Sequence, residues 1–362
     1  MRKALVALAV LSAGSLAHAQ SNMTIYGTVD AGYVKSTGTK AAMGEKYNNR
    51  LGFMGTEDLG NGLKATFQLE QRFNLFDGSS ANSKTFEGAS NVGLKGRFGQ
   101  VRFGRVDELS TETFRKIDPF EQYGVGSMFK THLRGDNLEG RISNTVRYDS
   151  PNLNGFQLGA SYTLKKGSKS YFSSWLEGMG VPEDVTVFTG NETAANDGYA
   201  ISATYANGPL YLVSNYNVAV NTNKSYNWNV GGAYTIGASR ISAGYEQTRA
   251  KDTALFEGAK WGTWLVGVSH KIGAGTVNAS YSQRKNSQDS STNQSRDKKI
   301  ALGYNHSLSK RTSVYVEASR TKYDSNAGIV TDYIGNFPRA LEMAMLGRDQ
   351  ITAIAIGMTH KF

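Results

Sequence analysis

Hydrophobic and polar residues alternate with a period of two through most of this chain. In the segment 62–73 the apolar set is Leu63, Ala65, Phe67, Leu69 and Phe73, and the polar set is Lys64, Thr66, Gln68, Glu70 and Arg72. Successive side chains of a β-strand point to opposite faces of a sheet. The pattern therefore predicts a strand that has one apolar and one polar face.

The same alternation recurs from Thr24–Tyr33 to a last set formed by Ile354, Ile356, Met358, His360 and Phe362. Seven tight connections separate these segments, at 57–62, 95–100, 149–155, 206–209, 236–239, 271–275 and 307–311. They alternate with eight longer polar connections, near 35–48, 74–86, 106–140, 166–197, 220–225, 250–259, 285–297 and 324–348. Together they predict about 16 antiparallel strands, which is within the range of outer-membrane barrels.

Composition narrows the choice among all-β architectures. The chain has 41 Gly and 19 Tyr but only 5 Pro and no Cys. The lack of cysteine argues against a small disulfide-stapled fold, and no segment offers the ~18 consecutive apolar residues of a spanning helix. If the protein enters a membrane, it does so as strands, which can cross hydrocarbon only in a closed barrel without an unpaired edge. A soluble β-sandwich shares some of this composition, so composition alone leaves that alternative open.

The N-terminus has the features of a secretory signal peptide. Arg2 and Lys3 precede an apolar run, and Ala17-His18-Ala19 offers a small-residue cleavage site. We expect residues 1–19 to be removed, which leaves one barrel domain of residues 20–362. Its formal charge is then +8 in place of +10, because Arg2 and Lys3 are lost.

Alternation stops over Val106–Gly140, the third of the long connections. The spacing of Leu109, Thr113 and Ile117 predicts a short helix through Ile117 that Asp107 caps. The segment holds eight apolar side chains, too many for an exposed, disordered loop, namely Leu109, Phe114, Ile117, Phe120, Tyr123, Met128, Phe129 and Leu133. A barrel of sixteen strands has a water-filled bore, and we expect residues 106–140 to fold into it.

Five stretches carry motifs that occur together in a known family. They are MTIYGTVDAGY (23–33), RLGFMGTEDLGNGLKATFQLEQRF (50–73), VGLKGRFGQVRFGR (92–105), NTVRYDSPNLNGFQLGASY (144–162) and AIAIGMTHKF (353–362). Because these stretches follow one another in the same order as in that family, the chain resembles the trimeric general porins of Gram-negative outer membranes, especially the beta-proteobacterial type. The resemblance covers essentially the whole chain after the signal peptide. It implies a homotrimer of 16-stranded barrels, each with its third loop folded inward as a constriction.

The resemblance also implies where the constriction carries charge. Arg50 and Arg141 match basic residues on the family's barrel wall. Asp118 and Glu121 of the loop resemble its acidic pair, although the order here is Pro-Phe-Glu where several relatives have Pro-Glu-Phe. These four residues are therefore predicted to face one another across the bore.

Other positions complete the predicted site or depart from the family pattern. The basic residue that many relatives carry ahead of VGLKG is missing, and this stretch has Glu87, Gly88 and Asn91. Arg72 and Lys64, inward by alternation, are our predictions for the remaining positive charge. The terminal aromatic Phe362 is similar to the signal by which barrel-assembly machinery recognises its substrates.

The resulting hypothesis is passive diffusion of small hydrophilic solutes and ions, without catalysis or a cofactor. Unit charges ~8 Å apart interact by about 0.5 kcal/mol in bulk water and by ~2 kcal/mol at an effective dielectric of ~20. Opposed rows of charge should therefore bias which ions pass, and the net positive charge predicts a weak anion preference. The expected partners are two further copies of the chain, outer-membrane lipid and lipopolysaccharide, and the barrel-assembly machinery.

Three other functions compete with this one. A solute-specific outer-membrane channel would use loop aromatics such as Phe120, Tyr123 and Phe129 as a binding track, and a secreted adhesin would be a β-sandwich. An enzyme would need partners for His132, the one histidine in the key loop, that the spacing does not show. Basic residues are spread over the strands without a concentrated patch of interleaved aromatics, so nucleic acid is not an expected partner.

Overall fold

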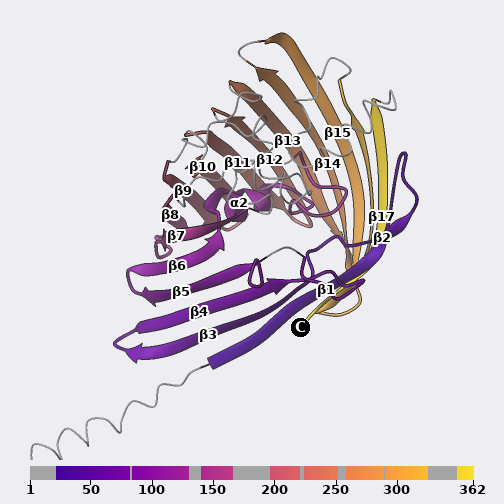
Figure 1. The fold of residues 1–362 in the computed structure, drawn as a ribbon. Coiled ribbons are helices and arrows are strands. Elements are labelled where there is room, and N and C mark those ends of the chain that lie inside the picture. Colours follow the sequence, from indigo (N-terminus) through magenta and orange to yellow (C-terminus); the bar gives the residue numbers. More distant parts are fainter. Residues whose placement is uncertain are drawn as a thin grey trace, which may run out of the picture.

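The structure, a computed structural model, describes residues 22–81, 84–129, 140–165, 196–220, 224–251, 258–288, 291–324 and 349–362. The predicted signal peptide at 1–19 lies outside these ranges and stays a prediction, and Leu133 and His132 of the third long connection lie outside them as well. Within them, the chain forms a single antiparallel sheet that curves around a central space (Figure 1).

Apart from the short β2 (Ala42–Gly44), each strand of the described ranges pairs with the strand before it and the strand after it. The strands are β1 (Asn22–Ser36), β2 (Ala42–Gly44), β3 (Arg50–Gly60), β4 (Leu63–Arg72), β5 (Ala89–Gly96), β6 (Gly99–Asp107), β7 (Arg141–Asp149), β8 (Phe156–Thr163), β9 (Gly198–Asn207), β10 (Leu210–Val218), β11 (Tyr226–Ile236), β12 (Ser239–Arg249), β13 (Ala259–Ile272), β14 (Gly275–Gln288), β15 (Ser291–Ser307), β16 (Thr312–Lys322) and β17 (Gln350–Lys361). The three-residue β2 pairs with β1 beside the ring. The other sixteen described strands form a closed barrel, as the sequence predicts.

The first and last strands close the ring. β1 pairs with β3 through its first half and with β17 through its second half. Two backbone hydrogen bonds join Gly27 and Phe362, with N···O distances of 3.0 and 3.2 Å. A Cβ atom on Gly27 would lie 2.3 Å from the Phe362 ring, so the glycine allows the terminal aromatic to pack flat against β1.

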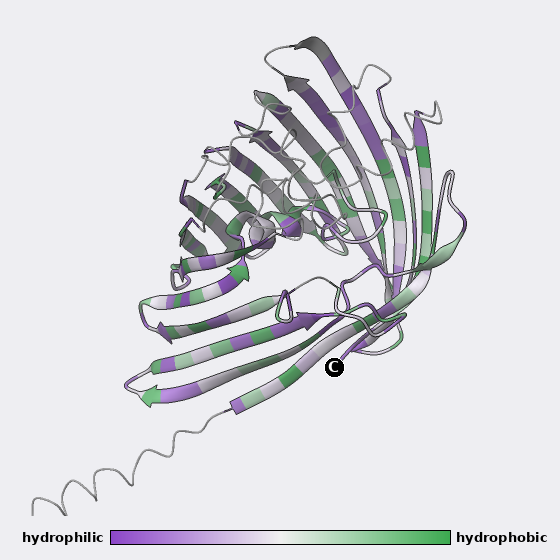
Figure 2. Ribbon diagram, viewed as in Figure 1, coloured by the Kyte–Doolittle hydropathy of each residue, from purple (hydrophilic) through white to green (hydrophobic). Residues whose placement is uncertain are grey.

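The two faces of the barrel differ as the period of two predicts. Figure 2 shows hydrophobic and hydrophilic residues alternating along the strands. On the outside, aromatic side chains of neighbouring strands pair across β9 to β14, at ring distances of 6.4 Å for Tyr199–Tyr216, 5.3 Å for Trp228–Tyr245 and 5.0 Å for Trp264–Tyr281. Such outward aromatics form the interfacial girdles of membrane barrels.

Six of the seven predicted tight connections are short hairpins. The seventh, 149–155, also joins neighbouring strands, β7 and β8, but it is longer and contains an additional turn. The connection predicted over 285–297 is wrong: β14 extends to Gln288, and β15 begins at Ser291. The sequence is misleading here because both faces of this hairpin are polar, which removes the alternation by which a strand is recognised.

No helix in the part of the chain that the structure describes is both long and apolar enough to cross a membrane.

Candidate functional site: a constriction inside the barrel

The third long connection enters the barrel immediately after β6. It begins with α2 (Leu109–Phe114), followed by a 3-10 turn, η1 (Arg115–Ile117). The helix is where the sequence predicts it, but its cap is Glu108 rather than Asp107, and the Glu108 carboxylate accepts from the Thr111 N–H at 2.9 Å. Asp107 is instead the last residue of β6, because its pairing with Arg141 extends the strand by one more position.

The loop runs along the inner face of the barrel wall. Helix α2 contacts β8 to β11, and η1 contacts β11 and β12 (Figure 1). The contact is apolar, and its buried members are Phe114, Ile117, Met128, Tyr211, Val213, Ala233 and Leu265. Burying a side chain of the size of Phe or Ile stabilises by roughly 1.5–3 kcal/mol. Six of the eight apolar residues that suggested an enclosed loop are buried, Tyr123 is half-buried, and Leu133 lies outside the described residues.

Glycines on the inner wall make room for this packing. A Cβ atom on Gly159 would lie 2.6 Å from Leu109, and one on Gly267 would lie 2.3 Å from the Pro119 ring. Equivalent positions occur at Gly231 and Gly244 under Phe114 and Ile117, and at Gly303 under Phe120. Contacts this short do not occur between real carbon atoms, so a side chain at any of these positions would push the loop into the bore.

The far end of the loop is fixed by hydrogen bonds to the opposite wall. The Gly126 N–H donates to the Glu317 carboxylate of β16 at 3.3 Å. Lys46 pairs with the same carboxylate at 2.5 Å, and both side chains are buried. Lys299 of β15 donates to the Ser127 carbonyl at 2.6 Å. The loop is therefore held at its start, along its length and near residue 127.

Asp118 organises the loop from within. Its carboxylate accepts backbone N–H groups of Phe120 at 3.0 Å, Gln122 at 3.1 Å and Met128 at 2.9 Å. The side chain is buried, and burial raises the pKa of the Asp118 carboxyl although these three hydrogen bonds and Lys299 act in the opposite direction. Glu121, three residues on, is exposed, with a φ of 54°. The two predicted acids thus differ, since Asp118 faces the loop backbone and Glu121 is solvent-exposed.

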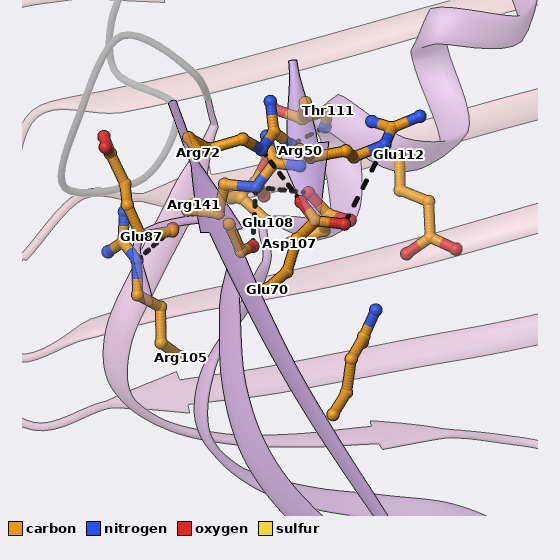
Figure 3. Close-up of polar contacts among 12 residues, drawn as sticks. Arg50, Glu70, Arg72, Glu87, Arg105, Asp107, Glu108, Thr111, Glu112 and Arg141 are labelled. Carbon is orange, nitrogen blue, oxygen red and sulfur yellow. Dashed lines mark hydrogen bonds and ion pairs between the residues drawn. The ribbon is translucent and has the colours of Figure 1, made fainter. Parts of the chain in front are cut away.

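Arginines gather on the part of the wall that the loop leaves uncovered. Arg50 of β3 and Arg72 of β4 are directly paired in the sheet register. Glu70 lies between them, with N···O distances of 2.8 Å to Arg72 and 4.0 Å to Arg50. Figure 3 shows Arg50, Arg72 and Arg141 lying together around Glu70 and Asp107.

Arg141 joins this cluster through Gly88. Its Nε donates to the Gly88 carbonyl at 2.9 Å and lies 3.3 Å from the Asp107 carboxylate. The Gly88 N–H in turn donates to the Glu70 carbonyl at 2.9 Å, and a Cβ atom on Gly88 would lie 2.2 Å from Glu70 Oε1. A glycine at position 88 lets the Glu70 carboxylate approach the arginines.

A second row of charges continues from the cluster along β6 and β7. Arg147 lies 2.7 Å from both Glu112 of α2 and Asp149, and Asp149 lies 2.7 Å from Arg102. Arg147 also donates to the Asp107 carbonyl at 2.8 Å. The row therefore ties the loop helix to the wall at the start of the loop.

The structure brings together Arg50, Arg72 and Arg141 of the predicted site, but it places Lys64 elsewhere. Lys64 is exposed beside the β3–β4 turn, opposite Asp58. It is eight residues from Arg72, a distance of about 26 Å along a strand. Alternation predicts the inward face of Lys64, but it does not predict the height of a residue along the bore.

Several residues of the site were missed by sequence reasoning. Glu70 could have been found, because alternation places it on the inward face beside Arg72. Asp107 was interpreted as a helix cap. The wall glycines gave no signal, because the chain holds 41 glycines and nothing in their spacing marks the ones under the loop.

Electrostatically the site is almost balanced. Arg72 and Arg141 are buried against carboxylates, whereas the Arg50 side chain is 23% exposed. Among the described residues, no group of three or more His, Asp or Glu side chains is placed to hold a metal ion. The arrangement of arginines and carboxylates can attract or repel a passing ion.

A closed barrel with an apolar outside, a polar inside and an inward loop opposite a row of arginines defines a membrane channel of the porin class. The chain belongs to the Gram-negative porin family, whose family model matches residues 4–326. It is 30% identical to outer membrane porin protein 32 of Delftia acidovorans, over 100% of both chains. It is accordingly an outer-membrane protein that forms a channel for passive diffusion.

Solved structures share the fold. An anion-selective porin from Comamonas acidovorans superposes with a TM-score of 0.73, at 24% identity, over 94% of this chain and 100% of that one. The trimer form of OmpT from Vibrio cholerae superposes with a TM-score of 0.64, at 13% identity, over 94% of this chain and 99% of that one. Both likenesses concern the fold alone.

Proposed function

We propose that the constriction gives this porin a weak preference for anions as small hydrophilic solutes and ions diffuse through it. The observation that carries the proposal is the partial exposure of the Arg50 side chain, 23%, in a cluster where Arg72 and Arg141 are buried and paired with carboxylates. Carboxylates lie next to the arginines, so the excess positive charge that an ion meets is small. A transverse field of this kind biases ion passage modestly and is screened by salt.

Within this proposal the predicted residues have different roles. Arg50 is the charge presented to passing ions, and Arg72 and Arg141 hold the carboxylates that surround it. Glu121 is the exposed acid of the loop, and Asp118 fixes the loop's shape. Lys64 is too far along the bore to contribute to the narrow region.

The test is the reversal potential of single channels in a planar bilayer under a salt gradient. Arg50→Ala should shift the reversal potential toward cations at an almost unchanged conductance. Lys64→Ala removes one positive charge from the same inner face, about 26 Å away, and should shift it much less. If the two variants gave equal shifts, selectivity would follow total bore charge, and the assignment to the constriction would be wrong.

We also propose that three copies of the chain assemble into a trimer. The channel would work by diffusion alone, without catalysis and without a cofactor. Support comes from the family and from the trimeric OmpT fold relative. The barrel-assembly machinery would recognise the terminal Phe362, and outer-membrane lipid would surround the trimer. A species that migrates at three times the monomer mass until heated would support the trimer, and monomers under mild detergent would contradict it.

A further inference from the structure

Two tyrosines from different long connections contact each other inside the barrel. Tyr47 lies between β2 and β3, and Tyr123 lies in the constriction loop. Their ring centres are 5.1 Å apart, with an angle of 60° between the ring planes, and both side chains are half-buried. We call these two residues the tyrosine pair. Aromatic rings attract a further ring at centre distances of ~4.5–7 Å, so the exposed parts of the pair offer a surface to an aromatic solute.

A cation lies beside each ring of the tyrosine pair. The Arg115 guanidinium carbon is 4.8 Å from the centre of the Tyr123 ring, and the Lys361 Nζ is 5.6 Å from the centre of the Tyr47 ring. These are ordinary distances for a cation on an aromatic face. Neither cation forms an ion pair with a carboxylate of the described residues, and the Arg115 Nε is buried without a hydrogen-bond partner. Both therefore retain positive charge that a solute anion can neutralise.

The acids near the tyrosine pair do not cancel this charge. Glu317 is paired with Lys46, whose Nζ lies 5.0 Å from the Tyr47 ring centre, and both members of this ion pair are buried. Glu121, two residues before Tyr123, is exposed and carries one negative charge. The unpaired groups beside the two rings are thus two cations and one acid, an excess of positive charge.

The sheet register adds Arg50 to the same region. Thr28 of β1 is opposite Arg50 of β3 on one side and opposite Lys361 of β17 on the other. Directly opposite residues point to the same face of a sheet, and Thr28 is buried on the inner face. Neighbouring strands are ~4.8 Å apart, so the backbones of Arg50 and Lys361 are separated by about 10 Å. Both charges therefore face the bore at the same height, across the strand that closes the barrel.

We propose that the tyrosine pair, Lys361 and Arg50 form a binding site for small aromatic carboxylates that diffuse through the channel. The solute ring packs on the tyrosine pair, and its carboxylate forms charge-assisted hydrogen bonds with Lys361 or Arg50. Aromatic surface with a few convergent polar groups is the usual construction of a small-molecule site. This site rests on the proposed function, since Arg50 takes part in both, and it deepens that function by naming a class of solute.

Block of single-channel KCl currents by benzoate tests the site on the unaltered protein. Benzoate bound in the constriction interrupts the current, and the frequency and duration of the interruptions give a Kd. Cyclohexanecarboxylate is the matched probe, because it has the same charge and nearly the same size but no aromatic ring. Benzoate should bind more tightly by about threefold or more, in line with the contribution of one aromatic contact. Equal Kd values for the two acids would overturn the proposal.

Variants locate the site on the chain. Tyr47→Leu with Tyr123→Leu should abolish the difference between the two acids, whereas Tyr47→Phe with Tyr123→Phe keeps both rings and should preserve it. Lys361→Ala should weaken benzoate binding by about threefold or more. Lys271→Ala removes the same charge beside the β13–β14 turn, four strands along the barrel from β17, and should change the Kd less than about twofold. A benzoate preference that survives the loss of both rings, or equal effects of the two lysine variants, would overturn the proposal.

Reversal potentials in KCl alone separate this site from the anion preference. The variant with both tyrosines replaced by leucine loses no charge, so its reversal potential should equal that of the wild type. A channel without anion preference that still binds benzoate more tightly than cyclohexanecarboxylate would support the aromatic site and refute the proposed selectivity. An anion-selective channel that binds the two acids equally would refute the aromatic site alone.

Discussion

The Glu317 carboxylate on β16 accepts the backbone N–H of Gly126 and pairs with Lys46, so one buried acid joins the barrel wall, the first long connection and the constriction loop. This relationship explains how the loop remains in place inside a wet bore. Its apolar residues hold it on β8 to β13, and Glu317 fixes its other end on β16.

Glu317→Gln should loosen the loop. The substitution leaves the buried Lys46 ammonium without its partner, and removal of one member of a buried ion pair destabilises by ~3–5 kcal/mol. We expect noisier single-channel currents and a lower temperature of barrel unfolding. The double variant Glu317→Gln with Lys46→Met removes both charges and should recover part of the loss. Currents as quiet as those of the wild type would show that Glu317 does not hold the loop.

Gly267→Ala should move the loop without touching a charge. Its Cβ would lie 2.3 Å from the rigid Pro119 ring, and overpacking of this kind costs about 1–3 kcal/mol. We expect a changed single-channel conductance with the reversal potential little affected. Gly232→Ala is the control, because its Cβ would face outward and meet the flexible Leu212 side chain at 3.0 Å and the Tyr211 carbonyl oxygen at an ordinary contact distance of 3.5 Å. Equal conductance changes in both variants would contradict the packing argument.

Glu70→Gln should increase the anion preference, the opposite of Arg50→Ala. The Glu70 carboxylate lies 2.8 Å from Arg72 and 4.0 Å from Arg50, so its neutralisation uncovers positive charge at the constriction. Reversal potentials under a salt gradient measure the shift. Asp58→Asn removes one negative charge beside the β3–β4 turn and should change the reversal potential less. A shift toward cations in Glu70→Gln would show that the carboxylate acts mainly by positioning the arginines.

Asp118 should link stability to pH. Because burial raises the pKa of its carboxyl, the folded state holds this proton more tightly than the unfolded chain. The resulting stabilisation is full below the ordinary pKa of about 3.9 and is lost as the pH rises through the raised value. The stability of the wild type relative to Asp118→Asn should therefore be greatest near pH 3 and smaller near pH 7. Thermal unfolding of both proteins across this range measures it, and a constant difference would refute the link.

The sequence allowed the barrel to be predicted in detail, because alternation is a local property. The faces of β4, the positions of the tight turns and the enclosed loop all follow from the period of two and from where it stops. The hairpin at 285–297 was missed for the same reason, since a strand that is polar on both faces has no alternation. Residue preferences favour aspartate as a helix cap, so the sequence predicts Asp107 in this role. In the structure Asp107 pairs with Arg141 in the sheet, and Glu108 caps the helix instead.

The period of two and its interruption are enough to predict most of the strands, their inward and outward faces, a sheet without an open edge and most of the residues buried in the loop. The height of each inward residue along the bore follows only from the folded barrel, because register and stagger depend on pairing between strands. That is why Arg50, Arg72 and Arg141 meet around Glu70 while Lys64, on the same face, does not. It is also why Gly267 and Gly303 lie under the loop, since what a glycine faces is set by a segment distant in the sequence.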